Sequence, residues 1–235
     1  MKHTMKLFQI GLRQISRDGM LIVLLPAPFL IGAFLKLAAP LANQILTAKC
    51  SFSIAPWYGL ADGMLICLTP MFVAMISAFL LLDERDQGVS AFYQVTPAEG
   101  FAYLAARIGL PMIGAFIATW IVATAFTLAS FPFEVILGGA LISSFTGVAL
   151  AMMVVSIAGN RVEGLALSKL MGISFIGLLF AWLVPAPYRW LASFLPSFWI
   201  GRLLTGGADL LSFLLGLASC LFWIALFTRR FLRKI

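Results

Sequence analysis

The sequence predicts an all-α polytopic membrane protein with six transmembrane helices. Of its 235 residues, 62% are hydrophobic and 11% are charged, whereas soluble domains carry about 25% charged residues. The mean hydropathy of +1.05 agrees with this class. The apolar residues form long runs and do not alternate with polar ones, which excludes a transmembrane β-barrel. We also expect an N-terminal amphipathic interfacial helix, a cytoplasmic hairpin, and a re-entrant or interfacial element before the last helix.

Six apolar segments have the length of about 20 residues that crosses about 30 Å of hydrocarbon. They are Met20 to Ala42, Gly59 to Leu82, Ile108 to Ser130, Phe133 to Ala158, Leu165 to Val184 and Asp209 to Thr228. These segments leave no room for a soluble domain, so residues 1–235 are expected to form a single transmembrane domain. No Lys precedes a Ser or Thr, so the phosphate-binding GxxxxGK[ST] loop is absent. Any nucleotide hydrolysis would therefore come from another chain.

The positions of Lys and Arg predict the orientation of the chain. Twelve of them lie in the lead-in, in the second and fourth loops, and in the tail: Lys2, Lys6, Arg13, Arg17, Arg85, Arg107, Arg161, Lys169, Arg229, Arg230, Arg233 and Lys234. The opposite loops contain three, which are Lys49, Arg189 and Arg202. This asymmetry predicts that both termini are cytoplasmic, in a plasma or inner membrane. The net charge of +7 is thus explained by membrane orientation, and we expect no nucleic-acid partner.

Few residues of the chain are suited to catalysis or to metal binding. The only histidine is His3, and the three cysteines, Cys50, Cys67 and Cys220, have no metal-binding spacing. No paired carboxylates or nucleophile–base combination stands out, so we expect no catalytic residue, no metal and no intramembrane enzyme. The middle parts of the spans are nearly uncharged, which argues against an ion-coupled carrier.

The lead-in of residues 1–19 has amphipathic helical spacing. Met5, Phe8, Leu12 and Ile15 recur on one face, and cations lie on the other. Such a helix rests in the interface with its apolar face towards lipid. Alternatively, it also braces a cytoplasmic partner.

Prolines and two charged residues modify the first two spans. Pro26 and Pro28 interrupt the first span and Pro70 interrupts the second, because proline removes a backbone hydrogen bond. We expect Thr69 to satisfy a carbonyl that Pro70 frees. Lys36 and Asp62 lie towards the outside of these spans. They form an intramembrane polar pair, or else Lys36 extends to the headgroups and Asp62 lies in the interface.

The loop of residues 83–107 opens with an unusual group of acids. Asp83, Glu84 and Asp86 follow the second span, although a helix C-terminus favours cations. We therefore expect a new short helix over Gln87 to Gln94, with Gly88 permitting the turn before it.

The expected short helix has an aromatic flank formed by Phe92 and Tyr93, and Thr96-Pro97 would end it. Such a hairpin suits insertion into a groove on a partner protein. The alternative is a solvated loop whose aromatic side chains rest on lipid headgroups.

Four stretches of the chain resemble type-2 permeases of ATP-binding-cassette (ABC) transporters. Glu84-Arg85-Asp86-Gln87-Gly88 resembles their E-[RK]-[ED]-x-G motif, which leads into the coupling helix, and Val95-Thr96-Pro97 resembles the end of that element. Asn160-Arg161-Val162-Glu163-Gly164, followed by Lys169, resembles a stretch between helices four and five of small members. Leu195 to Trp199 also matches. The chain departs from the family at Val89, where a Ser or Thr is common.

The resemblance implies the membrane-spanning permease subunit of an ABC exporter, paired with an identical or sister permease over two ATPase subunits. It implies that this chain binds no cofactor itself and that ATP and Mg are bound by the partner ATPase. The residues it assigns to coupling are Glu84, Arg85, Asp86, Gly88, Phe92, Tyr93, Thr96 and Pro97, and those of the second cytoplasmic loop are Asn160, Arg161, Glu163 and Lys169. The alternative is a stand-alone membrane carrier or assembly factor without an ATPase.

Residues 185–207 precede the last span and are rich in aromatic residues and prolines. This stretch is too apolar for a free loop and too interrupted for a spanning helix. Because aromatic residues favour the headgroup boundary, we expect short interfacial or re-entrant helices on the external side.

Overall fold

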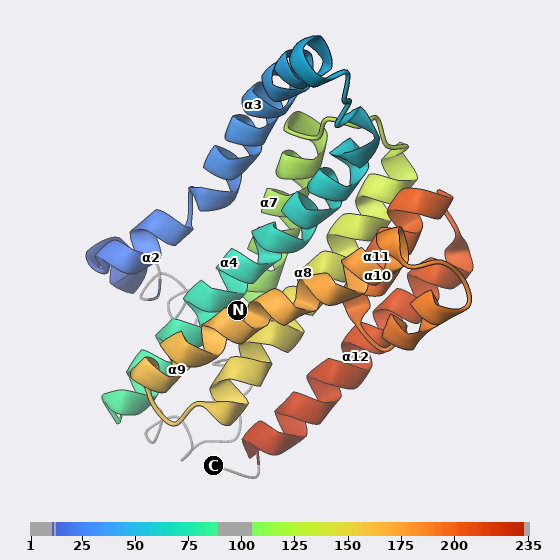
Figure 1. The fold of residues 1–235 in the computed structure, drawn as a ribbon. Coiled ribbons are helices and arrows are strands. Elements are labelled where there is room, and N and C mark those ends of the chain that lie inside the picture. The colour runs from blue at the N-terminus through green and yellow to red at the C-terminus, as the bar shows by residue number, and fades with distance from the viewer. Residues whose placement is uncertain (1–10, 12, 89–104, 233–235) are drawn as a thin grey trace.

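A computed structural model describes residues 11, 13–88 and 105–232. The described residues form a bundle of helices (Figure 1) without strands. The six candidate spans are Gly19–Cys50, Ala55–Asp86, Arg107–Ala125, Phe133–Ile157, Arg161–Leu183 and Leu210–Phe231. The six predicted spans are therefore confirmed, with shifts at their ends.

The first span is divided by a break next to a proline. Asp18 caps α2 (Gly19–Leu24) by accepting from the backbone N–H groups of Met20 and Leu21. After the break, α3 (Ala27–Cys50) begins behind Pro26. Proline is tolerated at a helix start because the N–H it lacks has no intrahelical partner there. Helix α3 lies at the edge of the bundle (Figure 1), and it is mostly exposed to the surroundings.

Helices α4 (Tyr58–Asp86) and α8 (Phe133–Ile157) form the buried centre. They approach closely at Gly147, where an added Cβ would lie 3.0 Å from the carbonyl oxygen of Pro70. The proline remains inside a continuous helix. The hydroxyl of Thr69 donates to Leu65 O at 2.9 Å and does not reach the carbonyl of Ile66, the one that Pro70 leaves free. The expected role of Thr69 is therefore wrong.

The remaining spans surround this centre. A π-helical turn (Ala105–Gly109) leads into α7 (Leu110–Ala125). The fifth span consists of α9 (Arg161–Ser168), the 3-10 segment η3 (Lys169–Ser174) and α10 (Phe175–Leu183). The last span, α12 (Leu210–Leu232), packs on α8 and α11.

The element before the last span is re-entrant. It contains η4 (Tyr188–Ala192) and α11 (Pro196–Gly206). The carbonyl of Phe194 accepts from Ser219 and Trp223, which lie about 14 and 20 Å along α12 at 1.5 Å per residue. The chain thus descends deep into the bundle and α11 returns. Phe198 and Trp199 are buried in the core and do not lie at a headgroup boundary.

Candidate functional site

One end of the bundle contains a polar network, which we call the clasp. It is formed by Asp18, Asp83, Glu84, Arg85, Asp86, Arg107 and Arg161. Four of these residues come from the last turn of α4, and the others lie at the beginnings of α2, α7 and α9. The clasp therefore joins helix ends that are far apart in the sequence.

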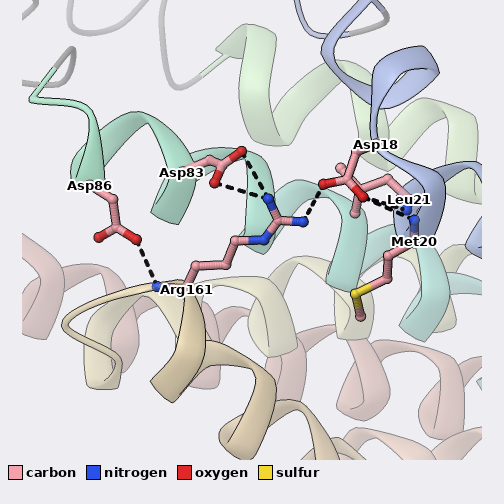
Figure 2. A network of polar contacts seen from close by, with 6 residues as sticks. All are labelled: Asp18, Met20, Leu21, Asp83, Asp86 and Arg161. Atoms are coloured by element: carbon pink, nitrogen blue, oxygen red, sulfur yellow. Dashed lines mark hydrogen bonds and ion pairs between the residues drawn. The ribbon is translucent and has the colours of Figure 1, made fainter.

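Arg161 is the centre of one half of the clasp (Figure 2). Its guanidinium donates to both carboxylate oxygens of Asp83, at 3.0 and 3.1 Å, and to Asp18. Its backbone N–H donates to Asp86 at 3.0 Å. A guanidinium suits this position because its planar fork offers donors in two directions. The first, second and fifth spans are thereby connected through one side chain.

Glu84 and Arg107 form the other half of the clasp, inside the protein. The guanidinium of Arg107 donates to both carboxylate oxygens of Glu84. The exposed fractions of the two side chains are 4% for Glu84 and 3% for Arg107. A buried charge needs such a partner, because removing either one leaves an ion without compensation. This pair holds the end of α4 against the start of α7.

Arg85 connects the end of α4 to two further spans. It donates to the carbonyl oxygens of Val155 at 3.3 Å and Ala158 at 3.0 Å, which lie at the C-terminal end of α8. A cation is favourable there because the last carbonyls of a helix have no intrahelical donor. The guanidinium carbon of Arg85 also lies 5.5 Å from the ring centroid of Phe231 on α12. With these contacts the clasp reaches all six spans.

The acids lie at the end of α4, and most of the short helix expected over Gln87 to Gln94 falls outside the described residues. Helix α4 continues to Asp86, so Asp83, Glu84 and Asp86 lie in its last turn. Their unfavourable position at a helix C-terminus is offset by Arg107 and Arg161, which other helices supply. The burial of Glu84 places its carboxylate within the subunit.

The turn expected at Gly88 is present. Gly88 follows α4 with a φ of +71°, a conformation that costs other residues about 1–2 kcal/mol. Nothing lies within 4 Å of a Cβ added there, so its backbone and not its surroundings requires glycine. The other predicted coupling residues, Phe92, Tyr93, Thr96 and Pro97, lie outside the described residues.

The second predicted stretch forms the start of α9. The side chain of Asn160 accepts from Glu163 N at 2.9 Å, and Glu163 accepts from the N–H of Gly159, the residue before this N-cap, in a variant of the capping box. At Gly164 an added Cβ would lie 2.4 Å from a side-chain carbon of Leu82, so glycine permits α9 to approach α4. Lys169 is exposed at the first residue of η3.

Lys36 and Asp62 do not pair with each other. The ammonium of Lys36 donates to Ala125 O, and the buried carboxylate of Asp62 accepts from Leu128 N and Ala129 N at 2.7–3.0 Å. Both side chains thus hold the connection between α7 and α8, at the end of the bundle opposite the clasp. Each charge finds backbone partners in this connection, so a direct pair is not needed.

Sequence reasoning missed Asp18 and the role of Arg107. Asp18 lies in a polar lead-in, and Arg107 was used only as an orientation charge. The available signal was the group of acids at the end of α4, because misplaced acids require cations from elsewhere. Within the part of the chain that the structure describes, no group of three His, Cys, Asp or Glu residues is placed to hold a metal.

Six candidate spanning helices, a charged clasp at the end of the second and a re-entrant element before the last form a polytopic membrane protein, and they fit the type-2 permease class that the sequence resembles. The chain belongs to the family described as "Fluoroquinolones export permease protein Rv2686c-like", whose model matches residues 11–229. It is similar to the fluoroquinolones export permease proteins Rv2686c and MT2760 of two Mycobacterium tuberculosis strains. Each is 25% identical over 202 residues, covering 81% of this chain and 77% of the relative. No solved structure matches.

Proposed function

We propose that this permease is the membrane-spanning subunit of an ATP-driven exporter and that it couples to separate ATPase subunits through residues 83–107. The observation that carries the proposal is the buried Glu84–Arg107 pair. The pair closes the base of this segment and joins it to the helices that a partner would have to move. The chain works with a second permease subunit, identical or a sister chain, in the lipid membrane.

The clasp gives such a segment mechanical continuity with the bundle. A force on residues between Glu84 and Arg107 acts on α4 and α7 together, because the pair fixes their ends to each other. Arg85 passes the same displacement to α8, and Arg161 passes it to α9 and α2. Packed and hydrogen-bonded elements of this kind move as rigid bodies. ATP-driven motion of a partner thereby becomes motion of the spans.

The charge distribution supports a cytoplasmic position for the clasp end. Arginines gather there in the described residues, namely Arg13, Arg17, Arg85, Arg107, Arg161, Arg229 and Arg230. The opposite end contains Lys49, Arg189 and Arg202. Basic loops favour the cytoplasmic side, so both termini are cytoplasmic in this proposal.

In this proposal the permease carries the exported molecule, and the partner ATPase binds the nucleotide. The curated relatives are named for the export of fluoroquinolones, and we assign a drug of that class as the exported molecule. ATP and Mg bind to the partner ATPase, because this chain has no phosphate-binding loop. The permease is the non-catalytic transport subunit.

The test is cross-linking in the assembled transporter. The permease is co-expressed with the ATPase subunit of the exporter, and a cysteine is introduced by Phe92→Cys. A cross-link from this position to the ATPase is expected. The control Tyr188→Cys, at an exposed position at the opposite end, should give none. The purified permease alone should hydrolyse no ATP. Absence of the Phe92→Cys cross-link in a complex that exports the drug would show that coupling occurs elsewhere.

A further inference from the structure

An apolar pocket of about 210 Å³ lies beneath the tip of the re-entrant element. Its walls come from α8, η3, the start of α11 and α12. We call it the α11 pocket, and the side chains that matter below are Ala149, Met153, Ile173, Pro196, Trp223 and Phe227. The clasp does not contribute to it.

The pocket lies in the half of the bundle nearer the clasp. Phe227 and Trp223 are about 8 and 14 Å from the end of α12 at Leu232, and Met153 is about 6 Å from the end of α8. Leu170 and Ile173 of η3 are about half exposed, so the pocket opens sideways towards lipid. Pro196 and its neighbours at the start of α11 line the pocket and close it towards the opposite end.

The aromatic wall of the pocket is held in a fixed orientation. The indole N–H of Trp223 donates to Phe194 O at 2.8 Å. The rings of Trp223 and Phe227 are stacked, with centroids 5.5 Å apart and an angle of 23° between their planes. A lipid acyl chain gains little from a ring held at one angle, whereas a planar aromatic molecule can stack on it.

We propose that the α11 pocket binds the planar aromatic ring system of the exported molecule, taken from the lipid leaflet on the clasp side. Pockets that enclose whole drug-sized ligands measure about 300–1,000 Å³, so this pocket holds one fused ring system and leaves polar substituents outside. Its position below α11 means that the molecule must pass the re-entrant element to reach the opposite end of the bundle. The substrate class and the orientation of the leaflet rest on the proposed function.

The test measures binding of norfloxacin to the full-length chain in lipid nanodiscs, by the fluorescence anisotropy of the drug. Trp223→Leu and Trp223→Phe both remove the hydrogen bond to Phe194, but only the first removes the ring. We expect Trp223→Leu to weaken binding about fivefold and Trp223→Phe to stay within about twofold of the parent chain. The control Leu221→Ala, at an exposed residue of α12 outside the pocket, should bind as the parent does.

A second variant fills the pocket without touching its aromatic wall, and a matched control adds the same bulk outside the pocket. Ala149→Phe places a ring inside the pocket and should reduce binding more than about tenfold. Its control, Ala225→Phe, adds the same bulk at an exposed position on α12. Melting temperatures of all variants identify any that fail to fold.

Three outcomes separate this proposal from the proposed function. If the parent binds norfloxacin and neither Trp223→Leu nor Ala149→Phe weakens it, the pocket assignment is wrong while drug export stands. If Trp223→Leu and Trp223→Phe lose affinity for norfloxacin equally, stacking on the ring is not the basis of binding and the proposal is overturned. If only a different planar dye, acridine orange, binds with the predicted variant pattern, the pocket is correct and the fluoroquinolone assignment is wrong.

Discussion

Glu84 at the end of α4 and Arg107 at the start of α7 form an ion pair that is almost completely enclosed by the protein. The two residues flank the segment that we propose to be the coupling element. Their pairing fixes the separation of its two ends inside the bundle. The position of the segment's base is therefore set by the permease itself, without help from a partner.

The first prediction concerns this pair. Glu84→Gln or Arg107→Met alone should destabilise the purified permease by about 3–5 kcal/mol, because each leaves a buried charge without its counter-ion. The double variant should be clearly more stable than either single variant. Thermal unfolding in detergent measures all three. Additive losses in the double variant would show that the two charges do not depend on each other.

The second prediction concerns the turn at Gly88. Gly88→Ala should cost about 1 kcal/mol through its positive φ and should reduce drug export by the assembled transporter. Gly88→Asn should be tolerated better, because asparagine adopts the left-handed conformation more readily. Gly114→Ala is the matched control, since Gly114 lies inside α7 with nothing within 4 Å of an added Cβ. Equal export by Gly88→Ala and Gly114→Ala would contradict a special role for this turn.

The third prediction separates the two roles of Asp18. Its carboxylate caps α2 and also accepts from Arg161. Asp18→Asn keeps a capping oxygen and loses the charge, whereas Asp18→Ala loses both. We expect Asp18→Asn to lower the free energy of unfolding by less than about 1 kcal/mol, because the ion pair with Arg161 is partly exposed and screened. Asp18→Ala should lower it by about 1 kcal/mol more, because the cap is lost as well. Hydrogen exchange of the α2 amides measures the local effect, and equal protection in both variants would exclude the capping role.

The pH dependence of this contact follows from the carboxyl of Asp18. The hydrogen bond from Arg161 lowers the pKa of Asp18 below its ordinary value of 3.8. A carboxyl whose pKa is lowered by folding stabilises the folded state above its unfolded pKa, and this contribution is lost as the pH falls through the folded value. The contribution of the Asp18–Arg161 contact to stability should therefore be constant between about pH 5 and 8 and decrease only below pH 3.8. An Asp18-dependent change in α2 protection between pH 5 and 8 would contradict this assignment.

The spans and the Gly88 turn could be predicted from sequence because their causes are local. A run of about 20 apolar residues has few alternatives to a spanning helix, and a glycine after a helix commonly adopts a positive φ. The clasp could not be predicted in the same way. Arg161 and Asp18 are 143 residues apart, and only the packing of α2 and of α9 on α4 brings them together.

The alternative of a direct Lys36–Asp62 pair is wrong for a related reason. The sequence shows that both charges need partners in an apolar region, and it offers either pairing with each other or exposure at the headgroups as the solution. A sequence does not show which backbone N–H or C=O groups lie near a charged side chain, because every residue has such groups. In the structure the amides after α7 and the carbonyl of Ala125 provide the partners.

The last prediction tests these separate roles of Lys36 and Asp62. Asp62→Ala should be the more damaging change, because it leaves the partly buried amides of Leu128 and Ala129 without an acceptor. An unsatisfied buried polar group costs about 1–3 kcal/mol, and two are affected. Lys36→Met should cost less, because the carbonyl of Ala125 lies at the exposed C-terminal end of α7, where water can replace the lost donor, and most of the apolar stem is conserved.

A double-mutant cycle in detergent, read by thermal unfolding, then distinguishes two arrangements. If the two side chains form a direct ion pair, the double variant Lys36→Met with Asp62→Asn should lose less free energy of unfolding than the two single variants lose in sum. Separate bonds to the α7–α8 connection predict losses that add within about 0.5 kcal/mol. Asp62→Asn retains an amide oxygen that can accept from Leu128 or Ala129, so it should be milder than Asp62→Ala. A coupling energy well above 0.5 kcal/mol would favour the direct pair and contradict the arrangement described here.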